Sequence, residues 1–212
     1  MSKFWAKSIV DAKLKFKEEK FDEGILILER LLNCQNTECV RESKKLLAKT
    51  LLQFGDKKEA AKKYFEELYS EKADISLAIE LMSLSTDLND VNSLKRYYGE
   101  SVNLIKNGAK FNLTLLNYVY FSFLVDLKCT FDETSDVIYK LIEDFKKIGI
   151  LDYHFLVTRG LPSFYDFLKK AERLYLKYGK EAELIEFLET QLKWVDESGK
   201  DAINEILKIH SV

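Results

Sequence analysis

The stretch from Ala48 to Leu68 constrains the fold more than any other part of the chain. Apolar residues recur there at helical spacing on both sides of a short break at Phe54-Gly55-Asp56. Small residues stand where two antiparallel helices would approach each other: Ala48 before the break, and Ala60 and Ala61 after it. The pattern predicts a helical hairpin with tight contacts at Ala48 and Ala60, where a larger side chain would overpack the interface.

The rest of the chain has few residues that would interrupt such helices. Its 212 residues include one proline and eight glycines, which favours long helices joined by short connections. Alternating runs of Val, Ile and Thr between turn residues, the usual sign of β-strands, do not occur at useful length. We therefore expect an all-α fold of about ten to eleven helices.

The hairpin pattern occurs twice in the first 70 residues. Ala12 lies 36 residues before Ala48, and Gly24 lies 36 residues before Ala60. In this spacing the chain resembles tetratricopeptide repeats (TPRs), whose helix pairs recur at about 34 residues. The positions that match the family's small and aromatic residues are Leu47, Ala48, Leu51, Ala60 and Tyr64 in one copy, and Ala12, Gly24 and Leu28 in the other.

The resemblance implies a fold and a domain organisation. Antiparallel helix hairpins would stack as a TPR-like right-handed α-solenoid, and residues 1–212 would form a single helical-repeat domain. Its clearest repeats would span residues 3–70, and degenerate repeats would span residues 73–148. C-terminal helices would follow at residues 162–210.

The resemblance also implies a function. Stacked hairpins of this family expose first-helix side chains on a concave groove that holds an extended or helical peptide. We therefore expect a non-catalytic protein–protein interaction module or scaffold. Four of the lining positions are lysines, so the partner protein or peptide could be acidic. The residues that the resemblance places in the groove are Ile9, Lys13, Phe16, Lys17, Lys45, Lys49 and Leu52.

Residues 111–125 contain no charged side chain. A transmembrane helix needs about 20 apolar residues, and Asn112 and Asn117 interrupt this shorter run, so we expect no membrane span. A helix that is apolar on all sides is usually buried. We expect neighbours near residues 91–105 and 134–148 to cover it in a monomer. The alternative is a homodimer or partner surface built on Tyr118, Tyr120 and Phe121.

Charge and cysteine usage suggest a compartment. The formal net charge is −2 at pH 7, so bulk charge indicates neither nucleic acid nor an anionic membrane as a partner. Three cysteines without metal-ligand spacing favour a reducing environment over a disulfide framework. The N-terminal residues lack the apolar core of a signal peptide. We therefore expect a cytoplasmic protein.

The sequence offers few residues for catalysis. His154 and His210 lie far apart and neither belongs to a metal-binding doublet, while Cys129 follows the apolar stretch and is expected to be a buried small hydrophobe. No glycine-rich phosphate loop and no Gly-x-Ser-x-Gly occurs. We therefore predict no catalytic residue, no cofactor and no metal site. An enzyme remains an alternative.

A nucleic-acid-associated helical protein is a further alternative. The first twenty residues carry six lysines, with Trp5 and Phe16 among them, and Lys44, Lys45 and Lys49 continue the basic character. Basic residues with interleaved aromatics could follow a phosphate backbone. The same lysines could equally form a solubilising helix face, which Glu18 and Glu19 already dilute.

Overall fold

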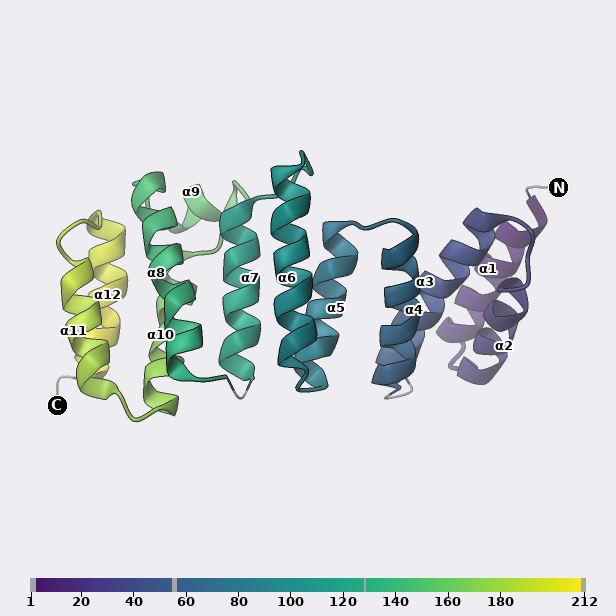
Figure 1. Ribbon diagram of the computed structural model, residues 1–212, viewed down its shortest axis with the longest axis horizontal. Coiled ribbons are helices and arrows are strands. Elements are labelled where there is room, and N and C mark those ends of the chain that lie inside the picture. Colours follow the sequence, from purple (N-terminus) through teal and green to yellow (C-terminus); the bar gives the residue numbers. More distant parts are fainter. Residues whose placement is uncertain (1–2, 55–56, 128, 211–212) are drawn as a thin grey trace. The chain divides into compact units, whose positions relative to one another are not determined.

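The computed structural model describes residues 3–54, 57–127 and 129–210, and within these ranges the protein consists of twelve helices without a strand (Figure 1). The all-α prediction is confirmed, with one helix more than expected because α9 forms in the irregular segment after residue 149. Gly55 and Asp56 of the predicted break lie outside the described residues. The helices are α1 (Lys3–Lys17), α2 (Phe21–Leu31), α3 (Thr37–Phe54), α4 (Lys58–Glu71), α5 (Ile75–Asp87), α6 (Val91–Lys106), α7 (Leu113–Asp126), α8 (Phe131–Ile148), α9 (Tyr153–Val157), α10 (Phe164–Lys177), α11 (Glu181–Gln191) and α12 (Glu197–His210).

Local sequence signals set several helix ends. The Asp74 carboxylate accepts a hydrogen bond from the backbone N–H of Leu77 at 2.9 Å and caps α5. Thr130 forms a capping box with Glu133 at the start of α8. Gly149 ends α8 with a φ of 73°, in the left-handed region that favours glycine. These ends follow from side chains within three residues, so sequence predicts them well.

The chain divides into two compact units, Met1–Ser101 and Val102–Val212, and their boundary falls within α6. Within each unit, adjacent helices run in opposite directions (Figure 1). The prediction of a single repeat domain with right-handed stacking along the whole chain stays a prediction.

In the N-terminal unit each of the first four helices packs against the next helix, and several helices also contact the second next. The α1–α2, α2–α3, α3–α4 and α4–α5 pairs are in contact, and α1 also contacts α3. Lys49 of α3 lies 4.0 Å from Glu80 of α5. Tyr69 of α4 packs edge-on against Tyr97 of α6, with ring centroids 5.6 Å apart. This pairing is the one that stacked helical hairpins require.

The C-terminal unit shows the same order of contacts once the short α9 is set aside. Consecutive pairs α7–α8, α8–α10, α10–α11 and α11–α12 are in contact, and so are the second-next pairs α7–α10 and α10–α12. Both units are therefore helical-repeat-like in their packing.

Helix α7, which is uncharged except for Asp126 at its end, packs against α8 and α10. Asn117 donates a hydrogen bond to Asp144 of α8 at 3.0 Å, and Phe121 packs against Phe167 of α10 with centroids 5.9 Å apart. Tyr120 is buried. The sequence anticipated the contact with α8 but not the one with α10. None of the helices in the described part of the chain has the length and apolarity that crossing a membrane requires.

The hairpin contact in α4 lies one residue away from its predicted place. Ala61 is fully buried, together with Phe65 and Leu68, whereas Ala60 is exposed. One residue turns the side chain by about 100° around a helix, so the predicted contact at Ala60 is wrong. Ala48 is buried as expected. The true counterpart of Gly24 is thus Ala61, 37 residues later.

Gly24 shows why this position must be small. A Cβ atom added there would overlap the ring of Phe16, which packs against the core of the N-terminal unit. The backbone of α2 therefore lies directly against an α1 side chain, and only glycine leaves the space for it.

The neighbouring alanines of α4 provide a matched test of the hairpin contact. Ala61→Leu should lower the free energy of unfolding by about 1–3 kcal/mol because it overpacks the α3–α4 interface. Ala60→Leu should change it by less than about 0.5 kcal/mol because its side chain faces solvent. Urea denaturation of both variants measures the difference, and equal stabilities would contradict the observed register.

Candidate functional site

The seven residues predicted to contact a partner lie on α1 and α3. Ile9 is 8% exposed and belongs to a core cluster with Ala12, Leu28 and Leu47. Phe16 and Leu52 are half-buried. Little of Ile9 is therefore available to a partner. The role of these seven residues in binding stays a prediction. The side chains among them that solvent can reach are mainly the four lysines.

These four lysines form two pairs one helical turn apart: Lys13 with Lys17 on α1, and Lys45 with Lys49 on α3. All four side chains are exposed. Among the described residues no carboxylate lies within ion-pairing distance of Lys13, Lys17 or Lys45. Lys49 is 4.0 Å from Glu80, at the limit of an ion pair. We call these four residues the lysine pairs.

Two other lysines of the same helices, Lys15 and Lys44, form ion pairs. The Lys15 ammonium lies 2.7 Å from Glu23 of α2. The Lys44 ammonium lies 3.0 Å from Glu67 and 2.9 Å from Glu71, both on α4. Lys15 and Lys44, which face a neighbouring helix, are thus charge-compensated, whereas Lys13, Lys17 and Lys45 are not and Lys49 is compensated only weakly.

The aromatic residues of α1 are committed to packing. Trp5 and Phe16 both pack against the core cluster that contains Ile9. Trp5 is half-buried, and its indole Nε1 is buried without a hydrogen-bond partner among the described residues. Neither ring is therefore a free stacking surface beside the lysine pairs.

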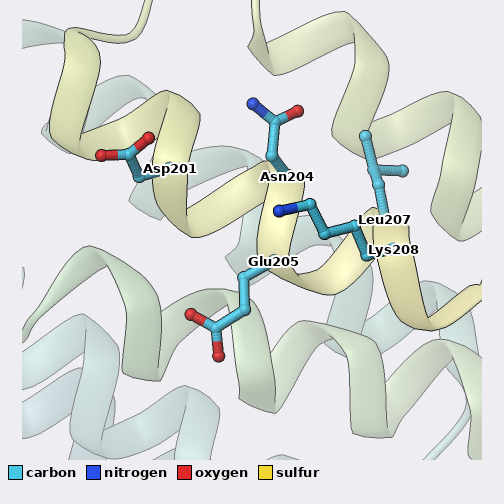
Figure 2. A pocket seen from close by; sticks show the side chains of 5 residues that line it. All are labelled: Asp201, Asn204, Glu205, Leu207 and Lys208. Atoms are coloured by element: carbon cyan, nitrogen blue, oxygen red, sulfur yellow. The ribbon is translucent and has the colours of Figure 1, made fainter.

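A hollow of about 470 Å³ lies in the C-terminal unit along α12. Figure 2 shows that its five lining side chains spread away from one helix in different directions. Glu205 is already engaged, since it accepts a hydrogen bond of 2.6 Å from the Tyr165 hydroxyl. A set of groups that does not converge provides no defined ligand geometry. The lining residues are Asp201, Asn204, Glu205, Leu207 and Lys208.

A second hollow of the same unit, about 270 Å³, is different in kind because α8, α10 and α11 all contribute to it. Four of its eight lining residues are aromatic and two are glutamates. We call it the aromatic cavity. Its lining residues are Phe131, Tyr139, Tyr175, Glu183, Glu186, Phe187, Thr190 and Gln191.

The cysteine and histidine side chains differ in their burial and accessibility. Burial raises the pKa of the Cys39 thiol to about 11, so the reactive thiolate is scarce at neutral pH. Cys129 is buried and His154 is exposed. Over residues 3–54, 57–127 and 129–210 no group of three or more His, Cys, Asp or Glu side chains could hold a metal ion.

His210 ties α12 to the two preceding helices. Its Nε2 lies 2.8 Å from Glu172 of α10, and its Nδ1 lies 2.6 Å from Glu181 of α11. Lys169 also contacts Glu172, at 2.5 Å. The hydrogen bonds to Glu172 and Glu181 raise the pKa of His210 above its ordinary value of 6.5. Burial raises the pKa of Glu172, but hydrogen bonds from Lys169 and His210 outweigh that effect and lower it below 4.5.

Comparison with known proteins adds no family to this description. No protein-family model matches the chain, and neither a curated protein nor a solved structure matches it.

The His210 cluster makes stability depend on pH. Because the folded-state pKa of His210 is raised, its contribution is complete below about pH 6.5 and is lost as the pH rises through the folded-state value. The lowered pKa of Glu172 removes its contribution as the pH falls below about 4.5. His210→Gln should therefore cost about 1–2 kcal/mol near pH 6 and less near pH 9. Denaturant unfolding at several pH values measures this cost.

His154→Gln is the matched control, since His154 is exposed and contacts neither glutamate. The control should leave the pH profile of the wild-type protein unchanged. A cost of His210→Gln that is the same at both pH values would contradict the ionic role of His210.

Proposed function

We propose that the N-terminal unit is a TPR-like protein-interaction module that binds an acidic peptide through the lysine pairs of α1 and α3. The observation that carries the proposal is the contrast in charge compensation. Lys15 and Lys44 are paired with glutamates of neighbouring helices, whereas the four exposed lysines carry almost uncompensated charge.

The helix packing supports the same proposal. In stacked hairpins the first helices of successive repeats lie side by side and line a shared surface. α1 contacts α3, and Lys49 of α3 reaches Glu80 of α5. The contacts of α1, α3 and α5 thus match those of first helices. An acidic peptide lying along them would meet the charges that the unit itself leaves unpaired.

Nucleic acid is the competing ligand for a basic surface. Sequence-independent binding of single strands combines lysines with aromatic rings on which bases stack. Trp5 and Phe16 are packed against the core, so the stacking half of that combination is missing on α1. This favours an acidic peptide over nucleic acid.

Charge reversal tests the proposal. Lys13→Glu combined with Lys45→Glu should weaken binding of a fluorescent Asp/Glu-rich peptide about five- to twentyfold at low salt, since each exposed charge contributes up to about 1 kcal/mol. The difference should shrink as salt is raised, because the Debye length falls to about 10 Å at 0.1 M. Fluorescence anisotropy measures both effects.

Two controls define the outcome. Lys63→Glu changes an exposed lysine on α4 and should leave the affinity within about twofold. A Gln/Asn-rich peptide of equal length should bind weakly to every variant. The proposal fails if the double variant binds the acidic peptide as the wild type does, or if a single-stranded oligonucleotide of equal charge binds more tightly than the peptide.

A further inference from the structure

We propose that the aromatic cavity of the C-terminal unit binds a methylated ammonium group. This site goes beyond the peptide surface proposed for α1 and α3, and none of its residues belongs to that surface. Its rings come from three helices: Phe131 and Tyr139 from α8, Tyr175 from α10 and Phe187 from α11.

The cavity has a buried floor and an open rim. Tyr175 is 4% exposed, and Phe187 and Gln191 are also buried, so they form the floor. Tyr139 is 59% exposed and Glu186 is exposed, so they stand at the rim. A ligand can therefore enter from solvent and come to rest on aromatic surface.

The floor and wall rings are held in fixed relation to one another. Tyr175 and Phe187 stack with centroids 5.6 Å apart and planes at 23°. Phe131 meets Tyr175 edge-on at 5.0 Å and 74°. Rings set at different angles present both π-faces and edges to the cavity, and the electron-rich faces attract cations.

The ring of Phe131 already contacts an ammonium group from this protein, that of Lys180. The Lys180 Nζ lies 4.6 Å above the centroid of Phe131 and 2.7 Å from both carboxylate oxygens of Glu183. An aromatic face with an adjacent carboxylate is thus an ammonium site in this protein. The proposed ligand would repeat this arrangement on the neighbouring rings with Glu186.

Charge in the cavity favours a monocation. Its lining has two carboxylates, Glu183 and Glu186, and no basic side chain. Lys180 compensates Glu183, whereas Glu186 has no cationic partner in the described part of the chain. One negative charge is therefore left over beside four aromatic rings.

Hydrogen-bonding capacity favours methylation of that cation. A primary ammonium needs three acceptors. Thr190 and Gln191 donate to the carbonyls of Glu186 and Phe187, and the Gln191 Oε1 accepts from Trp194. On the buried floor Gln191 is therefore engaged, and the Tyr175 hydroxyl is the acceptor left for a ligand. The other acceptors of the lining stand at the exposed rim: Tyr139, Glu183, Glu186 and Thr190. Few acceptors and much aromatic surface suit a methylated ammonium better than a primary amine or a guanidinium.

The volume restricts the ligand further. About 270 Å³ is below the range of about 300–1,000 Å³ that is usual for drug-sized ligands. The cavity therefore suits a head group, either that of a small choline-like molecule or that of a methylated lysine side chain.

Titration of the full chain with choline and with its neutral isostere 3,3-dimethyl-1-butanol tests the site. Chemical shifts or calorimetry should show choline binding at least about tenfold more tightly, since the ring faces attract a cation and not its neutral isostere. Equal binding of the two compounds, or no binding of choline, would overturn the proposal. A trimethyllysine peptide and its unmethylated form, titrated in parallel, distinguish a peptide ligand from a small free one.

Two substitutions in the lining test whether choline binds in the aromatic cavity. Tyr139→Leu removes a rim ring and should weaken choline binding about threefold. Glu186→Gln removes the uncompensated charge and should weaken it about two- to fivefold. The controls are Tyr153→Leu, at a tyrosine exposed to a similar extent outside the cavity, and Glu189→Gln, one turn along α11. The site is wrong if the controls weaken binding as much as the test variants do.

Discussion

Close approach of helix backbones at small residues is the constraint on which the N-terminal unit depends. Gly24 lies directly against the ring of Phe16, and the Cβ atoms of Ala12, Ala48 and Ala61 are fully buried. Tight approach at these points lets the larger side chains one turn away fill the interface at the density of a protein interior. Neighbouring helices can then contact each other, and several also contact the second next, so the unit is built from pairings that are local in sequence.

Charged side chains at the surface also connect helices that are close in sequence. Lys62 of α4 lies 2.7 Å from Asp90, and with Ser93 it holds the pKa of that carboxyl well below its usual range. Glu66 of α4 accepts a hydrogen bond from the Tyr97 hydroxyl of α6 at 2.9 Å. Such contacts fix the relative register of second-next helices, because a shift of one residue would separate the partners. Charges that are left over, such as those of the lysine pairs, can interact with other molecules.

Sequence predicted what depends on neighbouring residues and missed what depends on packing. The cap at Asp74 on α5 and the end of α8 at Gly149 are features that sequence can indicate, since both act within one turn. The choice between Ala60 and Ala61 depends on how α4 is rotated against α3, and either alanine satisfies the local pattern. Sequence analysis did not predict the aromatic cavity. Its rings are spread over residues 131–187, and in the sequence each occupies what looks like an ordinary apolar position of a helix. Only contacts between three helices bring them together.

Net charge was also a poor guide to local chemistry. The formal charge of −2 indicated neither nucleic acid nor an anionic membrane as a partner, yet it is a sum over compensated and uncompensated groups. Most of the ionic residues discussed above are paired within about 4 Å and create little field at a distance. A ligand interacts mainly with the charges that are not paired, and these include lysines on α1 and α3 and the carboxylate of Glu186 beside aromatic rings. A nearly neutral chain can in this way carry one surface suited to anions and one cavity suited to a cation.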